Sequence, residues 1–563
     1  MYTTRARQLA VACESMPSPE TLVIGAGLAG LTAAVHLAAR GAAVRVLEAD
    51  ALYPGGRLWG GPLRPHASLP GEAGEGGEAY NAVAVTLNGV TRTFYSEHGI
   101  HGLWNNYSNL RATLERFGIA PEVMLTEEEE WIHGEGERVR RAEVGSAIHG
   151  ALLPPPLHYL EMFTRPSFLG LLSLRDWLSL FAVWRSLLLA AALDPFARSL
   201  PLEGQTLADF LRGWSPRLQA LFVGLARSGL ASPPEKISLA SFIACLRFYT
   251  LLRRDSLRFT YFQTDSGTAL IEPLVEALCA REGELLLGVT ADRLEQMESD
   301  GWQVTGDAPP DARRSTRVTR WRVRAQTRLG PRTFLADHVI LAVDAPAAQR
   351  ILCESPATRA EAGKLTWPEG LPDGIVRLWF DARPRPGPEG GIFTGDFIVD
   401  NFFWLHRIQP EFAEWAKATG GSAIEMHLYR SDEFLSQPDA VLLARSITDV
   451  YRAYPELRGR VIRQTLQRNA ATHTRLTIDR PERWLGVRTP WPNLWACGDW
   501  VRGPWPSLFI ERACVSGVEA ANAALDGMGL EPFPIAPYPE PEWLAAKIQN
   551  WLLGGRAFIR SIR

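Results

Sequence analysis

A glycine-rich turn near the start of the chain limits the folds that the rest can adopt. The apolar run Thr21 to Ile24 enters Gly25-Ala26-Gly27-Leu28-Ala29-Gly30, and an alanine-rich stretch then extends to Arg40. A second apolar run covers Ala43 to Glu48. Short apolar runs predict buried strands, and the alanine-rich stretch predicts a helix. The chain therefore opens with a strand–helix–strand unit, which indicates an α/β protein with a parallel sheet.

The spacing of the glycines is typical of a dinucleotide-binding turn. Glycine at its first, third and sixth positions permits a tight turn, a close backbone approach to a pyrophosphate and close packing of the helix on the strand. The helix N-terminus then faces the phosphate charge. Glu48 ends the second strand, where a carboxylate would bind a ribose diol. We predict that Glu48 binds the cofactor together with Gly25, Gly27, Leu28, Ala29 and Gly30.

A second glycine pair follows the second strand. Gly55 and Gly56 permit close backbone approach, and Arg57 can pair with a phosphate. The stretch from Glu48 to Arg57 resembles the corresponding part of the amine oxidase and carotenoid desaturase superfamily of flavoproteins. The resemblance implies that the cofactor is FAD. No cysteine lies in a context for covalent flavin attachment, so we expect FAD to be bound non-covalently.

The end of the chain is similar to the closing FAD motif of the same superfamily. The similarity covers residues 493–500, 506–513 and 516–517. It implies that Gly498 and Asp499 contact the ribityl or pyrophosphate part, and that a helix starting near Ser507 and Leu508 points its positive end at the flavin. In these proteins the backbone at the position of Val289 contacts the adenine.

Residues 97–110 narrow the resemblance further. Glu97, Gly99, His101, Tyr107 and Asn109 match a stretch that follows the Gly-Gly-Arg in phytoene and other carotene desaturases. With the ending at residues 510–513, the chain is most similar to bacterial ring-modifying carotenoid desaturases, a group that includes isorenieratene synthase-type desaturase/methyltransferases. This implies a carotenoid or isoprenoid desaturase that passes hydride from a lipophilic polyene to the flavin.

The same stretch supplies the candidate catalytic and substrate residues. Glu97 is a candidate for stabilising positive charge on the polyene, and the aromatic faces of Trp104 and Tyr107 are candidates for the same role. His98 and His101 are acid–base candidates, although a histidine in such a segment is more often structural. Because a flavin accepts hydride by itself, it is the main catalyst, and we select Glu97 and His101 as auxiliary groups.

Two kinds of alternative remain open: another flavin oxidase, of the amine oxidase, protoporphyrinogen oxidase or squalene-pathway dehydroxylase type, and a non-catalytic escort protein. The closing motif lacks the paired aromatic residues of monoamine oxidases, which disfavours amine substrates. A protoporphyrinogen oxidase or a squalene-pathway dehydroxylase would keep the flavin and change the substrate. A prenyl-lipid escort protein of the GDP-dissociation inhibitor type would keep the fold without redox chemistry. The electron acceptor of a desaturase would be a quinone or oxygen.

The order of the predicted elements indicates separate lobes. We predict an α/β fold in which a Rossmann-type, GR2-like FAD-binding lobe carries an inserted α+β substrate-binding lobe and a helical subdomain. The FAD-binding domain is discontinuous and comprises residues 20–64, 262–345 and 484–530. Residues 65–261 and 346–483 form the substrate-binding and helical domain, and residues 531–563 form a C-terminal amphipathic tail.

Periodicity supplies the individual elements. Helical patterns dominate residues 104–260, including Leu207 to Arg212 and Ser215 to Ser228. Further helices are expected at residues 268–281, 438–453 and 507–526, and residues 60–81 form a long loop that is either an insertion or a lid. The expected later strands are residues 284–289, 302–304, 318–326, 332–336, 338–343, 375–380, 397–404, 423–429, 461–466 and 493–497.

Charge and cysteine content exclude several other classes. The net charge of −3 gives no field that would attract nucleic acid, and the basic stretch Arg313 to Arg328 reads as a solvated hairpin face. The six cysteines are scattered without metal-ligand spacing, so we expect no metal and reduced thiols in the cytoplasm. The first twenty residues lack the apolar region of a secretory signal.

Two segments suggest contact with a membrane surface. Residues 169–193 are rich in leucine and aromatic residues, but Arg175, Asp176 and Arg185 interrupt the run, so we do not expect it to cross a bilayer. Residues 543–563 combine tryptophan and leucine at helical spacing with basic residues, a pattern that favours an anionic membrane surface. A helix packed on the body explains the second pattern equally well. The expected location is cytoplasmic, peripheral on the inner face of the membrane.

Overall fold

A five-stranded parallel sheet joins three segments that lie far apart in the sequence. The computed structural model describes residues 21–64, 81–179, 195, 204–298, 319–478 and 483–551. The strands lie in the order β10-β2-β1-β14-β20, and Thr21 of β1 is opposite both Val44 and His338. Each segment assigned to the FAD-binding domain contributes to this Rossmann-type sheet. Its strands are β1 (Thr21–Ile24), β2 (Val44–Leu47), β10 (Glu284–Leu286), β14 (His338–Leu341) and β20 (Leu494–Ala496).

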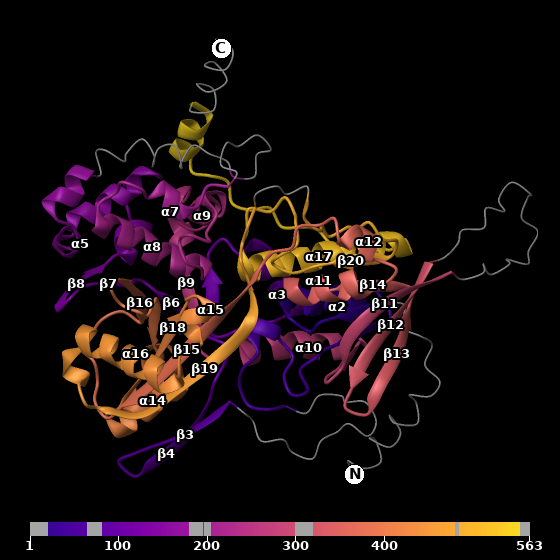
Figure 1. Ribbon diagram of the computed structural model, residues 1–563, viewed down its shortest axis with the longest axis horizontal. Coiled ribbons are helices and arrows are strands. Elements are labelled where there is room, and N and C mark those ends of the chain that lie inside the picture. Colours follow the sequence, from indigo (N-terminus) through magenta and orange to yellow (C-terminus); the bar gives the residue numbers. More distant parts are fainter. Residues whose placement is uncertain are drawn as a thin grey trace, which may run out of the picture.

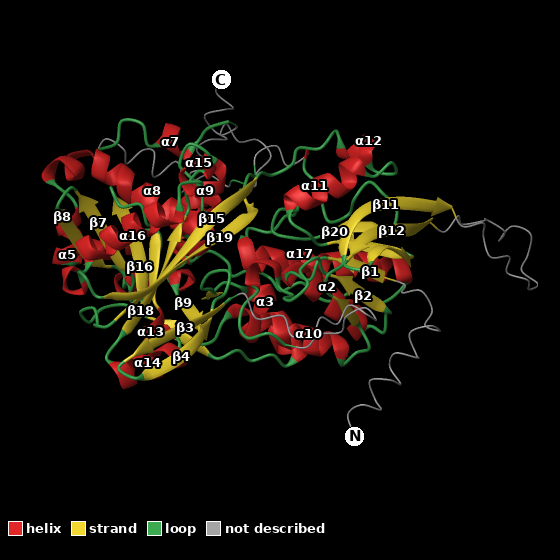
Figure 2. Ribbon diagram, turned by 60° about the horizontal axis from the view of Figure 1, so that its bottom comes forward, coloured by secondary structure: helices red, strands yellow, loops and turns green. Residues whose placement is uncertain are grey.

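Helix α2 is sandwiched between this sheet and α17, as Figures 1 and 2 show. Every residue from Leu28 to Ala38 is buried, because small alanine side chains let the two helices approach closely. A Cβ atom on Gly517 of α17 would lie 2.5 Å from the carbonyl oxygen of Ala29. The helices of this lobe are α2 (Leu28–Ala39), α3 (Ser108–Phe117), α10 (Glu272–Cys279), α11 (Ala345–Glu354), α12 (Arg359–Ala362) and α17 (Phe509–Met528), with the short helices η1 (Gly56–Leu58) and η5 (Gly267–Ile271).

A three-stranded antiparallel sheet flanks the parallel sheet. It consists of β11 (Thr290–Glu298), β12 (Thr319–Thr327) and β13 (Gly330–Ala336). The predictions for β12 and β13 are confirmed, whereas the predicted strand at residues 302–304 lies outside the described residues. Strand β11 was not predicted, because only Ala291 and Leu294 of its sequence turn fully inward.

A seven-stranded sheet forms the second lobe, in the order β19-β15-β18-β17-β16-β7-β8. The predicted strands at 375–380, 397–404, 423–429 and 461–466 and the helix at 438–453 are all present, but β15 starts five residues before the predicted start and β19 continues eight residues past the predicted end. The elements are β7 (Glu130–Glu135), β8 (Arg138–Glu143), β15 (Gly370–Phe380), β16 (Gly390–Gly395), β17 (Asn401–Trp404), β18 (Ser422–Leu428), β19 (Val461–Thr474), α13 (Leu405–Ile408), α14 (Pro410–Thr419), α15 (Asp432–Leu435), α16 (Asp439–Ala453) and η7 (Pro455–Leu457).

The prediction of a mostly helical region from residue 104 to 260 is wrong in its first part. Residues 123–143 form β6, β7 and β8, and the last two extend the seven-stranded sheet. Strand β7 buries the polar residues Glu130 and His133, and β8 consists largely of charged residues, so neither shows the apolar alternation of a half-buried strand. The helical part follows as α4 (Gly145–His149), η2 (Leu157–Thr164), α5 (Pro166–Leu171), α7 (Leu207–Phe210), α8 (Pro216–Leu230), α9 (Leu239–Leu246), η3 (Arg247–Leu251) and η4 (Asp255–Leu257).

Smaller elements connect the two lobes. Strands β3 (Ala82–Leu87) and β4 (Val90–Tyr95) form a hairpin, and β5 (Gly102–Trp104) and β6 (Val123–Thr126) pair with β9 (Phe259–Phe262). Most of the predicted loop, residues 65–80, lies outside the described residues. In the predicted tail, residues 531–542 form neither helix nor strand, and residues 543–551 are helical.

Candidate active site

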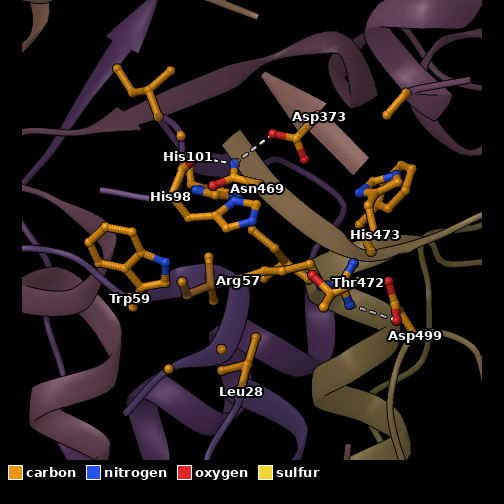
Figure 3. A pocket seen from close by; sticks show the side chains of 18 of the residues that line it. Leu28, Arg57, Trp59, His98, His101, Asp373, Asn469, Thr472, His473 and Asp499 are labelled. Carbon is orange, nitrogen blue, oxygen red and sulfur yellow. Dashed lines mark hydrogen bonds and ion pairs between the residues drawn. The ribbon is translucent and has the colours of Figure 1, made fainter. Parts of the chain in front are cut away.

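One cavity of about 1240 Å³ runs between the parallel sheet and the seven-stranded sheet. The glycine-rich turn and the motif around residue 499 line one end. The wall then continues along β15, β18 and β19 and reaches the helical region at α4, α8 and α9. Figure 3 shows Arg57 in this cavity, between Leu28 of the glycine-rich turn and the imidazoles of His98 and His101. Both lobes therefore contribute to a single site.

The glycine-rich turn has the conformation that its sequence predicts. Gly25 has φ of +105°, a value that favours glycine. A Cβ atom on Gly30 would lie 2.0 Å from the carbonyl oxygen of Gly25. Gly25, Gly27, Leu28 and Ala29 line the cavity, whereas Gly30 does not and instead permits the close packing of α2 on the turn.

Glu48 and Val289 lie beside each other at the adenine end. Glu48 accepts hydrogen bonds from the backbone N–H groups of Ala26 (2.8 Å) and Asp50 (2.9 Å), and burial raises the pKa of this carboxyl. The N–H of Val289 donates to the carbonyl oxygen of Glu48 at 2.8 Å. Both residues line the cavity, so the carboxylate is held by the turn at the place where the ribose is expected.

Arg57 and Asp499 form an ion pair in the cavity wall. The guanidinium Nη2 donates to Oδ1 of Asp499 at 2.8 Å, and the hydroxyl of Thr474 donates to the same oxygen at 2.8 Å. Burial alone would raise the pKa of Asp499, but the charge of Arg57 and these hydrogen bonds lower it. The other oxygen, Oδ2, is buried and has no hydrogen-bond partner among the described residues. An acceptor without a partner at this position fits a hydroxyl group of FAD.

The closing motif needs one correction. Gly498 lines the cavity with φ of +138°, and its N–H donates to the hydroxyl of Ser516 at 2.9 Å. Ser507 and Leu508 are fully buried and do not line the cavity, because the helix begins two residues later than predicted, at Phe509. The hydroxyl of Ser507 instead accepts from Tyr538 at 2.9 Å. The cavity residues at this helix end are Phe509, Ile510 and Ala513.

These observations fit FAD. Gly55, Gly56 and Arg57 also line the cavity, and Gly55 has φ of +116°. The backbone cradle, the buried acceptor on Asp499 and the carboxylate of Glu48 match the needs of a pyrophosphate, a ribityl chain and a ribose. When bound, FAD would supply a two-electron acceptor for hydride at this place.

The structure does not place Glu97 in the cavity. Its carboxylate accepts from the N–H and the hydroxyl of Ser266, both at 2.9 Å, and its carbonyl oxygen accepts from Arg377 at 2.6 Å. Burial and the nearby carboxyls of Glu425 and Asp265 raise the pKa of Glu97 well above its usual value. Glu97 therefore ties the segment after residue 96 to η5 and β15, and it does not contact a substrate in this cavity.

His98 and His101 do line the cavity. Burial lowers the pKa of His98 well below its usual value and lowers the pKa of His101 to about 4. His473 lies nearby, and burial lowers its pKa to about 4 as well. The Nδ1 atom of His101 is buried without a hydrogen-bond partner in the described part of the chain. These imidazoles are therefore neutral at pH 7.

An aromatic wall lines the cavity beyond the histidines. Trp104 packs against Tyr249 and Phe259, with ring centroids 4.8 Å apart in each pair. The hydroxyls of Tyr107 and Tyr249 lie 3.1 Å apart. All four line the cavity, so the structure brings the two predicted substrate residues together. Apolar side chains complete this part of the wall: Leu225, Phe242, Cys245, Leu246, Leu257, Tyr261, Ile375 and Phe403.

Several polar residues of the cavity were missed in the sequence. His427 and Tyr429 line it, and Glu425 lies directly behind His427. The pattern Glu-x-His-x-Tyr within the predicted strand at residues 423–429 could have indicated them. Alternate residues of a strand share one face, so the three polar side chains had to lie together. Asp373 and Asn469 lie on neighbouring strands, and the amide of Asn469 donates to Asp373 at 2.6 Å. No sequence spacing links these two residues.

The chain matches known proteins over nearly its whole length. The family described as "Flavin containing amine oxidoreductase" matches residues 28–525. The chain is similar to the carotenoid phi-ring synthase of Streptomyces griseus, with 28% identity over 91% of this chain and 89% of that protein. It is also similar to a probable zeta-carotene desaturase of Synechococcus elongatus, with 21% identity over 90% of this chain and 99% of that protein.

Solved structures share the fold. The chain is similar to a cyclohexylamine oxidase from Brevibacterium oxydans, with a TM-score of 0.59 and 15% identity over 91% of this chain and 100% of that one. It is also similar to a putrescine oxidase with bound putrescine, with a TM-score of 0.57 and 13% identity over 91% of this chain and 99% of that one. At these identities the likeness concerns the architecture alone.

Proposed function

The chain belongs to the family of flavin-containing amine oxidoreductases and is an FAD-dependent oxidoreductase, and from this premise we propose that it desaturates an end ring of a carotenoid. The observation that carries the proposal is the single cavity that joins the FAD motifs to the aromatic wall. Similarity to a carotenoid phi-ring synthase over most of both chains supports the ring as the reacting part.

The cavity wall supports a polyene over an amine. Beyond the histidines the wall consists of Trp104, Tyr107, Tyr249 and Phe259 with aliphatic neighbours, which offers a large apolar contact area. Aromatic faces also stabilise positive charge that develops on a polyene when hydride leaves. The neutral imidazoles of His98 and His101 add no positive charge that would oppose such a cation.

Product analysis tests this proposal. The purified FAD-loaded protein would be incubated with β-carotene, which has end rings, or with acyclic ζ-carotene, and the products separated by chromatography and weighed by mass spectrometry. We expect β-carotene to lose pairs of hydrogens from an end ring. Conversion of ζ-carotene alone would instead support desaturation of an open chain. Conversion of neither would contradict a carotenoid substrate.

We also propose that the protein binds the cytoplasmic face of a membrane peripherally. The segment between α4 and α5 exposes Leu152, Leu153, Leu157 and Leu160, and Leu152 is 91% exposed. The cavity reaches this region, because Gly145 and His149 of α4 line it. An exposed apolar surface beside the cavity supports direct uptake of a lipophilic substrate from a bilayer.

The C-terminal helix adds to the same surface. Trp543 and Trp551 are 61% and 76% exposed, while Ala545 is buried against the body. Arg254 joins the start of this helix to the segment just after α4, since it pairs with Glu542 at 3.0 Å and donates to the carbonyl oxygen of Ala151 at 2.9 Å. The helix therefore packs on the body and also presents tryptophan outward. No helix in the described part of the chain is long and apolar enough to cross a membrane.

Sedimentation with anionic liposomes tests the membrane proposal. We expect Trp543→Glu and Leu152→Ser to lower the fraction of protein that pellets, because each removes apolar contact area from the surface. Val441→Ser, which changes an exposed apolar residue on α16, is the matched control and should leave binding unchanged. Equal pelleting of all variants and of the native protein would contradict the proposal.

A membrane surface also offers an electron acceptor. We propose a quinone, because the exposed apolar surface would bring the reduced flavin close to lipid-soluble acceptors. Turnover with a short-chain quinone in the absence of oxygen supports this assignment. Formation of hydrogen peroxide in proportion to product, with no effect of quinone, would assign oxygen as the acceptor.

A further inference from the structure

Three polar side chains on one face of the seven-stranded sheet form a continuous hydrogen-bonded chain. Nε2 of His427 lies 2.8 Å from Oε1 of Glu425, and Nδ1 of the same ring lies 2.8 Å from the hydroxyl of Tyr429. His427 and Tyr429 line the cavity, whereas Glu425 is fully buried behind them. The intervening residues Met426 and Leu428 point into the opposite, apolar core. The order of groups is therefore carboxylate, imidazole, hydroxyl and cavity.

The carboxylate at the end of this chain is held firmly. Oε2 of Glu425 accepts from Nε of Arg377 at 2.7 Å, and Oε1 also accepts from the N–H of Ile100 at 2.7 Å. Burial would raise the pKa of Glu425, but the charge of Arg377 and the hydrogen bond to His427 lower it to about 2. Glu425 is thus ionised, and it fixes the orientation of the imidazole ring.

The hydrogen-bonded chain adjoins the segment that covers the FAD motif. A Cβ atom on Gly99 would lie 3.3 Å from Cε1 and Nε2 of His427. The N–H of His98, the residue before Gly99, donates at 3.2 Å to the carbonyl oxygen of Trp59, which lies two residues after Arg57 of the Gly-Gly-Arg sequence. Only the glycine backbone therefore separates His427 from the segment that connects to the FAD-binding lobe.

Desaturation requires an acceptor for a proton. Forming one double bond breaks two C–H bonds on adjacent carbons. One hydrogen leaves with its electron pair as hydride, for which the bound flavin of the proposed function is the acceptor. The other leaves as a proton, and its electron pair becomes the new C=C bond. The cavity must therefore contain a group that takes this proton.

We propose that Tyr429 and His427 form a proton relay for this step, with Glu425 as a positioning residue; the inference rests on the proposed function and names the base that it requires. The phenol oxygen of Tyr429 takes the proton from carbon while its own proton moves to Nδ1 of His427. The imidazolium is stabilised by Glu425 through Nε2–H, and the proton later returns to water. Among the described imidazoles that line the cavity, His427 is the one that bonds both a carboxylate and a hydroxyl.

Other cavity groups are weaker candidates. His98 and His101 have no hydrogen-bonded carboxylate among the described residues, and burial opposes their protonation. Asp373 lines the cavity, but its Oδ1 already accepts from Asn469 at 2.6 Å. Asp373 is the principal rival, so its variant belongs in the test.

The experiment mixes FAD-loaded protein with β-carotene without oxygen and records the loss of flavin absorbance. We expect Tyr429→Phe and His427→Ala to slow flavin reduction about 100-fold or more, the usual contribution of a general base. Added imidazole should restore the rate of flavin reduction in His427→Ala, whereas it would not restore the rate if the substitution had damaged the fold. Glu425→Gln should lower the rate at saturating carotenoid.

Two readouts besides activity accompany the rates. Flavin content should match the native protein in all three variants, and quenching of tryptophan fluorescence should give an unchanged Kd for β-carotene. Tyr454→Phe is the matched control, because Tyr454 also bonds a carboxylate, Glu130, at 2.7 Å but does not line the cavity. Its rate should equal that of the native protein.

The outcomes separate the relay from the function on which it rests. If the native protein does not reduce its flavin with any carotenoid, the proposed function falls and the relay with it. If the native protein reacts and Tyr429→Phe reacts equally fast, the relay alone is refuted. A large loss in Asp373→Asn without loss in Tyr429→Phe would assign the proton to Asp373.

Discussion

Replacing Asp499 by asparagine removes the negative charge beside Arg57 at the point where both line the cavity. One oxygen of Asp499 already holds Arg57 and Thr474, and the buried second oxygen is left to accept from FAD. A hydrogen bond to a charged group contributes about 1.5–3 kcal/mol. Since 1.4 kcal/mol corresponds to a tenfold change, we expect FAD affinity to fall by about 10- to 100-fold. Breaking a buried pair costs about 3–5 kcal/mol of stability, and the 27% exposure of Arg57 favours the lower value.

Titration of the apoprotein with FAD, followed by flavin fluorescence, measures the affinity, and thermal unfolding measures the stability. Because the pKa of Asp499 is lowered in the fold, the stability from this pair is present at neutral pH and is lost as the pH falls through the lowered pKa. The matched control is Asp337→Asn, since Asp337 pairs with Arg320 at 2.5 Å near the surface. The control substitution should lower the free energy of unfolding by less than about 1 kcal/mol and leave the affinity for FAD unchanged. If the Asp499→Asn protein binds FAD within twofold of the native protein, Asp499 does not contact the cofactor.

Three further predictions follow from burial and packing. Burial raises the pKa of Glu511 from 4.5 to about 7, so the stability that its protonated form contributes should be full below pH 4.5 and be lost as the pH rises through 7. The Glu511→Gln variant should therefore show a flatter dependence of melting temperature on pH in this range. An unchanged slope would show that Glu511 is not the source of the pH dependence. The Gly30→Ala substitution should abolish FAD binding, because the added Cβ atom would lie 2.0 Å from the carbonyl oxygen of Gly25. The control variant Gly170→Ala has open space around the added atom and should bind FAD as the native protein does. Exposed Cys279 should be alkylated in the native state and buried Cys497 only after unfolding, as mass spectrometry of peptides would show.

The FAD-binding lobe could be predicted because its constraints are local. The glycine-rich turn needs particular backbone angles at Gly25 and close packing at Gly30, and both needs appear directly as glycine in the sequence. The strands before and after the turn followed from apolar runs. The helix start at Phe509 was missed by two residues, because Leu508 and Ser507 are as compatible with a helix as the residues after them.

The substrate side of the site depends on packing between distant segments. Trp104 and Tyr107 were recognised because they belong to one motif and face the cavity together. Glu97 belongs to the same motif, but its carboxylate turns away to Ser266, which no local pattern shows. The hydrogen-bonded side chains of Glu425, His427 and Tyr429 could be predicted to face the cavity only once the position of their strand in the sheet was known. The same alternation on another strand would face solvent.

If the proposed function holds, one cavity holds FAD and a carotenoid together. The direct test is anaerobic mixing of the FAD-loaded protein with β-carotene while the flavin absorbance is recorded. We expect the flavin to bleach in proportion to the carotenoid oxidised, and to stay oxidised with putrescine and cyclohexylamine. Bleaching by an amine, with no response to any carotenoid, would contradict the claim and assign the cavity to amine oxidation.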